Sequence, residues 1–215
     1  MFVLKFAVFL PAKTKNKFIM KRIIAFFGIL VVMSSCDVVQ QLAGTYQLTQ
    51  CKYDFNSIAG LTLAGINLQN VNSLTSLNAT NLLALTSAFA TQSGSLPLNF
   101  TLNLDVTNPG VQTALLNGIG YILEIDGRQM TTGALQQKLQ IDGGQKAVLP
   151  VSMAFDLKQV LSGESLEVIK NLAFNFAGIG SGSSDVTVRL KPSFSVGNRT
   201  VESPNYIPVS FKLNK

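Results

Sequence analysis

The sequence predicts an all-β domain, a β-sandwich with one or two short helices, preceded by a helical signal segment at the N-terminus. Residues 98–107 alternate without a break between apolar and polar side chains, which is the period of a strand with one buried face. Short apolar segments separated by turn residues accompany this strand, a pattern typical of β-sandwiches. Residues 20–36 provide the third observation, because their layout is that of a secretory signal.

The segment 20–36 begins with Lys21 and Arg22, and residues 23–33 form an apolar run that is short for a membrane anchor. Small residues then stand directly before Cys36. A basic start, a short apolar core and a small-residue exit are typical of a segment that is removed from the mature protein. We expect residues 1–35 to be a leader, with translation starting at Met20 and a signal peptide over 20–35. An extended basic start over residues 1–19 is the alternative.

The end of this signal, Val32-Met33-Ser34-Ser35-Cys36, is similar to the lipobox of bacterial lipoproteins, although that family prefers leucine at the position of Met33. The resemblance implies that Cys36 is acylated on its sulfur and becomes the new N-terminus. It also implies a location in the bacterial cell envelope, lipid-anchored, with the outer membrane favoured over the inner. An ordinary signal, or a membrane helix with an incidental cysteine, is the alternative.

The positive charge of the chain lies in the leader. The whole chain has net charge +6 and a pI near 9.4, but six bases and no acid precede Cys36. From Cys36 onward 11 bases (17 less 6) and all 11 acids remain, so the mature net charge is zero. Nucleic-acid binding needs a clustered excess of Lys and Arg, so no nucleic-acid partner is expected.

After the leader, residues 36–44 are predicted to form a tether and residues 45–215 a single domain. A mature chain of 180 residues (215 less 35) can bury a sizeable hydrophobic core. Alternating side chains predict a first strand over 48–55. Residues 60–77 are rich in Leu, Asn, Ser and Thr, and we expect a strand followed by a polar loop there.

Asn78 is placed to cap a helix over 79–91, in which Leu82, Leu85 and Phe89 share one face. The clearest strand, 98–107, comes next and is ended by Asn108-Pro109-Gly110. Asn can bond its own backbone, Pro lacks a donor for the sheet, and Gly permits the turn. The residues of this strand expected to face the core are Leu98, Phe100, Leu102, Leu104 and Val106.

The rest of the chain continues as strands and turns. Asp126-Gly127 is a strong hairpin signal between two short apolar segments, and Pro150 predicts an edge or a bulge in its strand. Ser162 is placed to cap a second helix over 163–173. The remaining predicted strands are 121–125, 129–132, 147–155, 186–190 and 207–213.

Four motifs occur in an order that resembles the late-embryogenesis-abundant (LEA) type 2 domain. They are Asn108-Pro109, the strand 119–125 with Asp126-Gly127, Thr132-Gly133, and Val148-Leu149-Pro150-Val151. The resemblance covers roughly residues 96–157 and implies an immunoglobulin-like sandwich in which Asn108, Pro109, Asp126, Gly127 and Gly133 are structural turn residues. The chain departs from the family pattern by having Gly110 in place of a second Asn, and by lacking Trp and His.

The absence of histidine removes the usual general base, the Ser-His-Asp triad and the commonest metal ligand. Glu124 and Asp126 could bind calcium or act as acid and base, but a solvated strand face is the favoured interpretation. The glycines of 178–182 lack the lysine of a phosphate-binding loop. Cys51 is expected to be a buried structural thiol. We therefore expect no catalytic residues, no metal site and no cofactor.

The expected function is that of a lipid-anchored cell-envelope protein with a non-enzymatic interaction or structural role. Its expected partners are the membrane, through the lipid anchor, and an envelope protein or lipid. The resemblance to the LEA type 2 domain also allows an alternative, a membrane-proximal module that binds or transfers lipid. An unfilled apolar groove between the sheets would favour that alternative.

Overall fold

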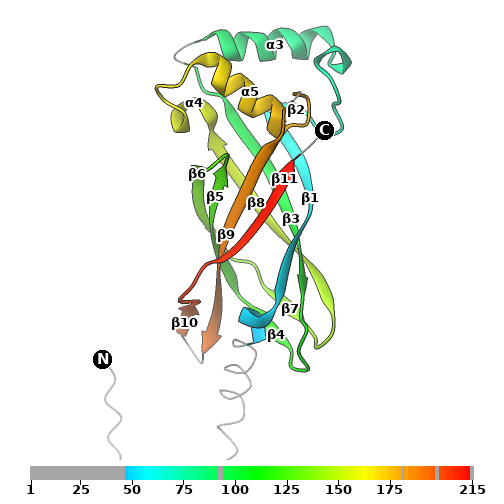
Figure 1. Ribbon diagram of the computed structural model, residues 1–215, viewed down its shortest axis with the longest axis vertical. Helices are drawn as coiled ribbons and strands as arrows, with labels where there is room; N and C mark the ends of the chain where they lie inside the picture. Colours follow the sequence, from blue (N-terminus) through cyan, green and yellow to red (C-terminus); the bar gives the residue numbers. More distant parts are fainter. Residues whose placement is uncertain (1–46, 92–93, 181, 197–198, 214–215) are drawn as a thin grey trace, which may run out of the picture. The chain divides into compact units, whose positions relative to one another are not determined.

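Two antiparallel sheets face each other across one hydrophobic core in the computed structural model of the chain (Figure 1). The structure describes residues 47–91, 94–180, 182–196 and 199–213. The predicted leader, Cys36 and the predicted tether therefore lie outside the described residues, as does the predicted helical signal segment. The expected all-β sandwich with a few short helices is confirmed.

The first sheet has the strand order β2-β1-β3-β8 and is built around β3 (Pro97–Thr107). All the β3 side chains predicted to face the core are buried. β3 pairs with β8 (Lys146–Asp156) in one continuous register, and with β1 (Lys52–Leu63) across two register shifts. A short β2 (Ile66–Asn67) folds back on the end of β1.

The second sheet has the order β10-β9-β5-β6, and β11 also pairs with β9. Its strands are β5 (Gly118–Ile125), β6 (Arg128–Leu135), β9 (Ser184–Val196), β10 (Arg199–Glu202) and β11 (Ile207–Leu213). Two further short strands, β4 (Ala114–Leu116) and β7 (Leu139–Ile141), pair with each other. The strands β4, β7 and β10 were not predicted, because they are short and carry no clear alternation.

The predictions of a hairpin turn at Asp126-Gly127 and of an edge strand at Pro150 are both confirmed. Asp126 and Gly127 join β5 to β6 with φ of 50° and 76°, and two successive positive φ values are the mark of the expected type I′ hairpin turn. Pro150 lies on β8, which is the last strand of its sheet. An edge strand tolerates proline because one side of it has no hydrogen-bonding neighbour in the sheet.

The helices α3, α4 and α5 and a 3-10 turn accompany the sheets, and the prediction for the second helix needs correction. α3 (Ala79–Ala90) begins at the predicted cap, since the Asn78 side chain accepts from the Asn81 amide at 2.7 Å. α5 (Leu166–Phe176) is capped by Ser165 instead of Ser162. Gly163 has φ of 92°, which no α-helix contains. α4 (Leu157–Val160) and η1 (Leu74–Ser76) were not predicted.

The first strand begins later than the alternation over 48–55 predicts, so that expectation is wrong at its start. Residues 47–50 are helical, and the Cys51 amide donates to the Leu48 carbonyl at 3.3 Å. A helical turn places residues three apart on one face. The spacing of the buried Leu48 and Cys51 therefore fits a helical turn, whereas in a strand these two residues would lie on opposite faces.

The sandwich has two different ends. The helices α3, α4 and α5 gather at one end, at the top of Figure 1, which we call the helical end. The opposite end, which we call the loop end, contains Gln47, the loop 108–113, β4, β7 and β10. Gln47 lies at this end because its side chain is packed against Gly110. A Cβ atom added to Gly110 would lie 2.1 Å from the Gln47 side chain.

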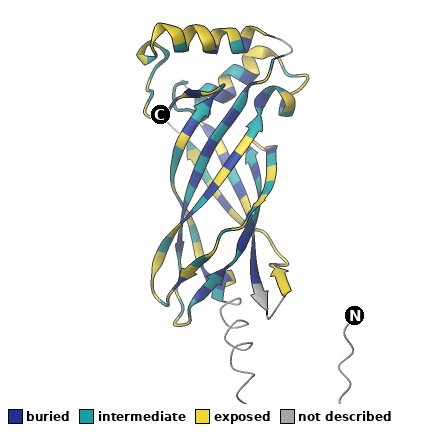
Figure 2. Cartoon of the chain, turned by 180° about the vertical axis from the view of Figure 1, so that it is seen from behind, coloured by how far each residue is buried: buried dark blue, intermediate teal, exposed yellow. Residues whose placement is uncertain are grey.

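The core runs between the sheets and is continuous from one end to the other (Figure 2). Phe100 at the centre of β3 packs against Phe176 of α5, with ring centroids 4.8 Å apart. Phe55 of β1 and Phe211 of β11 stack at 3.9 Å, which joins the edges of the two sheets along one seam. The helices at the end of the sandwich thus extend the same core.

Replacing Phe100 by alanine should lower the free energy of unfolding by about 3–5 kcal/mol through lost burial and a cavity. Thr101→Ala, one residue along and on the opposite face, should cost less than about 1 kcal/mol. Urea denaturation of both variants measures the difference. A larger loss for Thr101→Ala would show that the two faces of β3 are assigned the wrong way round.

Candidate functional site

The turn residues predicted from sequence are divided between the two ends of the sandwich and do not form a common site. Asn108 and Pro109 lie at the loop end, in the connection between β3 and β4. Asp126 and Gly127 lie at the β5–β6 turn, whose neighbour Arg128 forms an ion pair with Glu164 at the helical end. Cys36, the predicted lipidation site, lies outside the described residues.

Asn108 is fully buried and organises the loop end. Its Nδ2 donates to the carbonyls of Gln112, at 2.7 Å, and Ile141, at 2.9 Å. Its Oδ1 accepts from the Gly110 amide at 3.0 Å, which is the Asx-type turn expected for Asn before a Pro-Gly turn. One side chain thereby ties the loop before β4 to the end of β7, so its role is structural.

The prediction of a structural turn at Gly133 is wrong, because this residue lies inside β6, where its missing side chain makes room for an aromatic ring on the neighbouring strand. It pairs directly with Tyr121, and a Cβ at position 133 would lie 2.5 Å from the Tyr121 hydroxyl oxygen. Any side chain there would have to displace the ring. The Tyr121 hydroxyl in turn donates to the Ser152 carbonyl at 3.4 Å, which links the second sheet to the first.

At the helical end, Asp156 joins the start of β3 to the start of α4. Its carboxylate accepts from the Lys158 amide at 2.9 Å and from the Leu96 amide at 3.2 Å, and Ser95 donates its hydroxyl to it. Desolvation alone would raise the pKa of Asp156. The hydrogen bonds from the hydroxyl and the backbone amides together outweigh this desolvation, so the pKa of Asp156 lies below its ordinary value.

α3 is held on the sandwich by few contacts. Leu85 and Phe89 are its buried residues, and the Phe89 ring meets Phe174 of α5 edge-on with centroids 5.5 Å apart. The Lys158 ammonium donates to the carbonyls of Ala88, at 2.6 Å, and Thr91. A cation at these carbonyls is favourable because the C-terminus of a helix carries partial negative charge.

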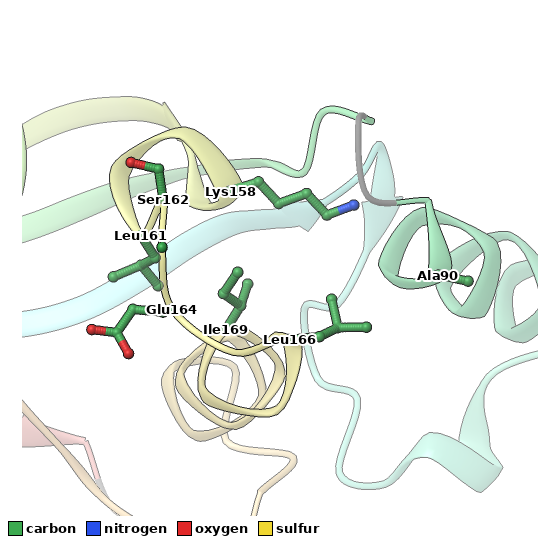
Figure 3. Close-up of a pocket in the computed structure, with 8 residues that line it drawn as sticks. Ala90, Lys158, Leu161, Ser162, Glu164, Leu166 and Ile169 are labelled. Atoms are coloured by element: carbon green, nitrogen blue, oxygen red, sulfur yellow. The ribbon is translucent and has the colours of Figure 1, made fainter.

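A cavity of about 450 Å³ lies between the end of α3, α4 and α5 (Figure 3). Leu161 and Ile169 form its apolar floor, and the partly exposed Leu166 stands at its rim. The two charged side chains in its wall are already engaged, Lys158 with the carbonyls of α3 and Glu164 with Arg128. The cavity suits a small uncharged or amphipathic group.

A smaller hollow of about 200 Å³ lies at the seam between the sheets. Phe55, Ile58 and Leu61 of β1, Phe176 of α5 and Leu213 of β11 line it, together with other uncharged residues of the described chain. Gln69 closes the neighbouring edge of β1, since its side chain bonds the Ile58 carbonyl and the Leu61 amide, both at 3.4 Å. The hollow is uncharged but only partly apolar, because Gln69 and Asn70 also line it, and it lies at an edge of the core.

The candidate chemical groups of the sequence are kept apart. Glu124 forms an ion pair with Arg189 at 3.0 Å, whereas Asp126 lies in the hairpin turn and accepts from the Asp185 amide at 2.8 Å. The two carboxylates therefore do not share a strand face as expected. No three His, Cys, Asp or Glu side chains of the described chain gather as a metal site.

Cys51 is buried, as predicted, and its thiol is unreactive. Its side chain is 7% exposed, and burial raises the pKa of the thiol to about 11. The pKa of neighbouring Tyr53 is also raised, mainly by burial and secondarily by the charge of Cys51. A thiol with so high a pKa holds almost no thiolate near neutral pH, and the thiolate is the nucleophilic form.

The uncharged surface of α3 at the helical end was not predicted, although its signal is visible in the sequence. Residues 55–104 contain no Asp, Glu, Lys or Arg, and α3 lies within this range. Leu83 of α3 is 69% exposed, and Leu82, Leu166 and Val168 are exposed as well. Surface helices usually carry charged residues on the face opposite the core, so the surface of α3 is unusual.

Comparison with known proteins reveals only distant similarity. No family model and no curated protein matches the sequence. Among solved structures, a putative late embryogenesis abundant protein is 12% identical with a TM-score of 0.37, covering 94% of this chain and 91% of its own. A protein from Arabidopsis thaliana is 14% identical with a TM-score of 0.36, covering 57% of this chain and 71% of its own.

A protein from Archaeoglobus fulgidus is 13% identical with a TM-score of 0.35, covering 55% of this chain and 86% of its own. The similarity to a LEA-type structure is therefore present but distant, and the sandwich of this chain rests on its own strand pairing. No helix among the described residues is both long enough and apolar enough to cross a membrane.

Asn108→Ala should lower the free energy of unfolding by about 1–3 kcal/mol for each buried carbonyl that loses its donor. The carbonyls of Gln112 and Ile141 are the two affected. Gln112→Ala is the matched control, because its side chain is exposed in the same loop and surface changes usually stay within about 0.5 kcal/mol. Thermal and urea melts that ranked the two variants equally would contradict the structural role of Asn108.

Proposed function

We propose that this chain is a lipid-anchored protein of the bacterial cell envelope that acts by binding, without catalysis, through its helical end. The observation that carries this proposal is the uncharged surface of α3. Leu82 and Leu83 are exposed there, and Leu166 and Val168 of α5 are exposed at the same end of the sandwich. Exposed apolar side chains that gather in one region are typical of interaction sites. An envelope protein is the partner that such a surface fits best.

Lipidation of Cys36 is supported by the order of the signal that precedes it, with a basic start, an apolar run and small residues. The chain has two cysteines, and the other one, Cys51, is buried with a raised pKa. Cys36 is thus the cysteine suited to modification. The favoured location is the outer membrane, and a mature chain with zero net charge gives no support to a nucleic-acid partner.

A non-enzymatic role is supported by the chemistry of the cavity. The chain has no histidine, and the charged side chains of the cavity wall, Lys158 and Glu164, bind α3 and Arg128. A general acid or base must be free to reach a substrate proton. Both groups would have to leave structural partners to do so.

A second candidate function, the binding of an acyl chain, is favoured by the hollow at the seam. Its lining residues Phe55, Ile58 and Leu61 are apolar, and it opens between the edges of β1 and β11. However, the space between the sheets is otherwise filled by the core. At about 27–30 Å³ for each methylene, which is the volume scale of one water molecule, the hollow holds only part of a chain.

Cys36→Ser should move the protein from the membrane fraction to the soluble fraction, or leave an unprocessed precursor. Each methylene that a membrane buries contributes about 0.8 kcal/mol, so an acylated Cys36 would hold the protein firmly. Fractionation of cells and intact-mass measurement test this. A Cys36→Ser protein that kept the mass and the membrane behaviour of an acylated chain would contradict the proposed anchor.

A photo-crosslinking amino acid at Leu83 should form adducts with an envelope protein in intact cells. The same probe at Thr132, an exposed position on β6, is the control, and a probe at Ile58 tests the hollow at the seam. Lipid adducts at Ile58 would favour the second candidate. If neither position exceeded the control at Thr132, both binding functions would be contradicted.

A further inference from the structure

The exposed large apolar side chains lie mainly at the two ends of the sandwich. Those of the helical end belong to the uncharged surface described above. A second group lies toward the loop end, where Val111 is 94% exposed and Val201 and Tyr206 are exposed as well. Val111 stands in the loop between β3 and β4, while Val201 belongs to β10 and Tyr206 follows that strand. The exception among the described residues is Val148 on the edge strand β8.

The described chain begins at the loop end. Gln47 lies against Gly110, the residue next to Val111. Eleven steps of chain (47 less 36) separate Gln47 from Cys36, and they reach at most about 40 Å when fully extended. The lipid on Cys36 therefore holds the loop end within this distance of the bilayer.

The helical end is much less suited to meet the same bilayer. β9 has 13 residues and spans about 43 Å at about 3.3 Å per residue. The chain before Gln47 would have to stretch along the whole sandwich for the helices to reach the membrane. An extended chain loses most of its conformational freedom, whereas contact through the loop end requires no extension.

We infer that the loop end docks on the bilayer that holds the lipid of Cys36, with Val111 inserted at the interface and Tyr206 at the depth of the head groups. The inference rests on the proposed lipid anchor and adds the orientation of the domain on the membrane. Tyrosine favours the interface because its ring is apolar and its hydroxyl is polar. Because the lipid already confines the domain to the surface, weak contacts suffice to orient it.

The charges of the loop end suit phosphate head groups. Lys52, Lys138 and Arg199 are exposed there and form no ion pair with another described residue. Two of the acids nearby form ion pairs: Lys146 binds Asp105 at the start of β8, and Lys191 binds Glu202 of β10 at 2.9 Å. Asp142 accepts from the Thr113 hydroxyl at 3.1 Å, and Asp54 is exposed without an ion pair among the described residues. Three cations and two carboxylates at this end thus have no charged partner, which leaves a small positive excess that attracts anionic lipid.

The test uses the full lipidated chain, purified from bacterial membranes and reconstituted in vesicles of phosphatidylethanolamine and phosphatidylglycerol. A polarity-sensitive dye is attached to Val111→Cys or Tyr206→Cys at the loop end, or to Leu83→Cys at the helical end. Wild-type chain treated in parallel measures the labelling of Cys51, which burial should keep low. The expected result is a blue shift of emission, and quenching by nitroxide-labelled lipid, at positions 111 and 206 but not at 83.

A second measurement separates insertion of Val111 from mere proximity. Val111→Asp should reduce the quenching of a dye at Tyr206→Cys, because a charged side chain resists transfer into the interface. The matched control, Leu83→Asp, should leave that quenching unchanged. Equal effects of the two substitutions would contradict docking through Val111.

Flotation of the same samples distinguishes the failure of this inference from the failure of the proposed anchor. Protein that does not float with the vesicles contradicts the anchor and the docking together. Protein that floats but is quenched at Leu83→Cys, or at none of the three positions, leaves the anchor intact and overturns the docking through the loop end.

Discussion

The structure depends on the continuous pairing of β3 with β8. Eleven residue pairs, from Pro97–Asp156 to Thr107–Lys146, follow one register without a shift. Because side chains alternate along a strand, one register keeps a whole face of β3 in the core. The same pairing positions both ends of the domain. Asp156 at one limit caps α4, and Asn108, just past the other limit, binds the loop before β4 and the last residue of β7.

Much of this fold is predictable because its signals are local. The alternation of β3, the Asn78 cap and the Asp126-Gly127 turn each depend on a few adjacent residues, and each was predicted correctly. Errors arise where local signals fit two structures. Residues 48–55 predict one strand, although the three-residue spacing of Leu48 and Cys51 fits a helical turn. The choice between Ser162 and Ser165 as a cap depends on the backbone of Gly163.

The candidate site was less predictable, since its residues are distant in sequence. Lys158 reaches the carbonyls of Ala88 and Thr91, and no local pattern predicts contacts across some seventy residues. The lack of charged residues over 55–104 is visible in the sequence itself. It becomes meaningful only once the structure places α3 on the surface with two buried residues. A charge-free stretch inside a core would need no explanation.

The division of the domain into two ends follows from the strands. Each sheet is built of long antiparallel strands whose sides carry the ion pairs, as Arg189 with Glu124 does on the second sheet. Connections between such strands must gather at the ends, where backbone leaves the sheet. The ends are therefore free to differ, and here one carries the helices with the charge-free α3, while the other carries Val111 and a small excess of unpaired cations. A domain built in this way can face a membrane with one end and a partner with the other.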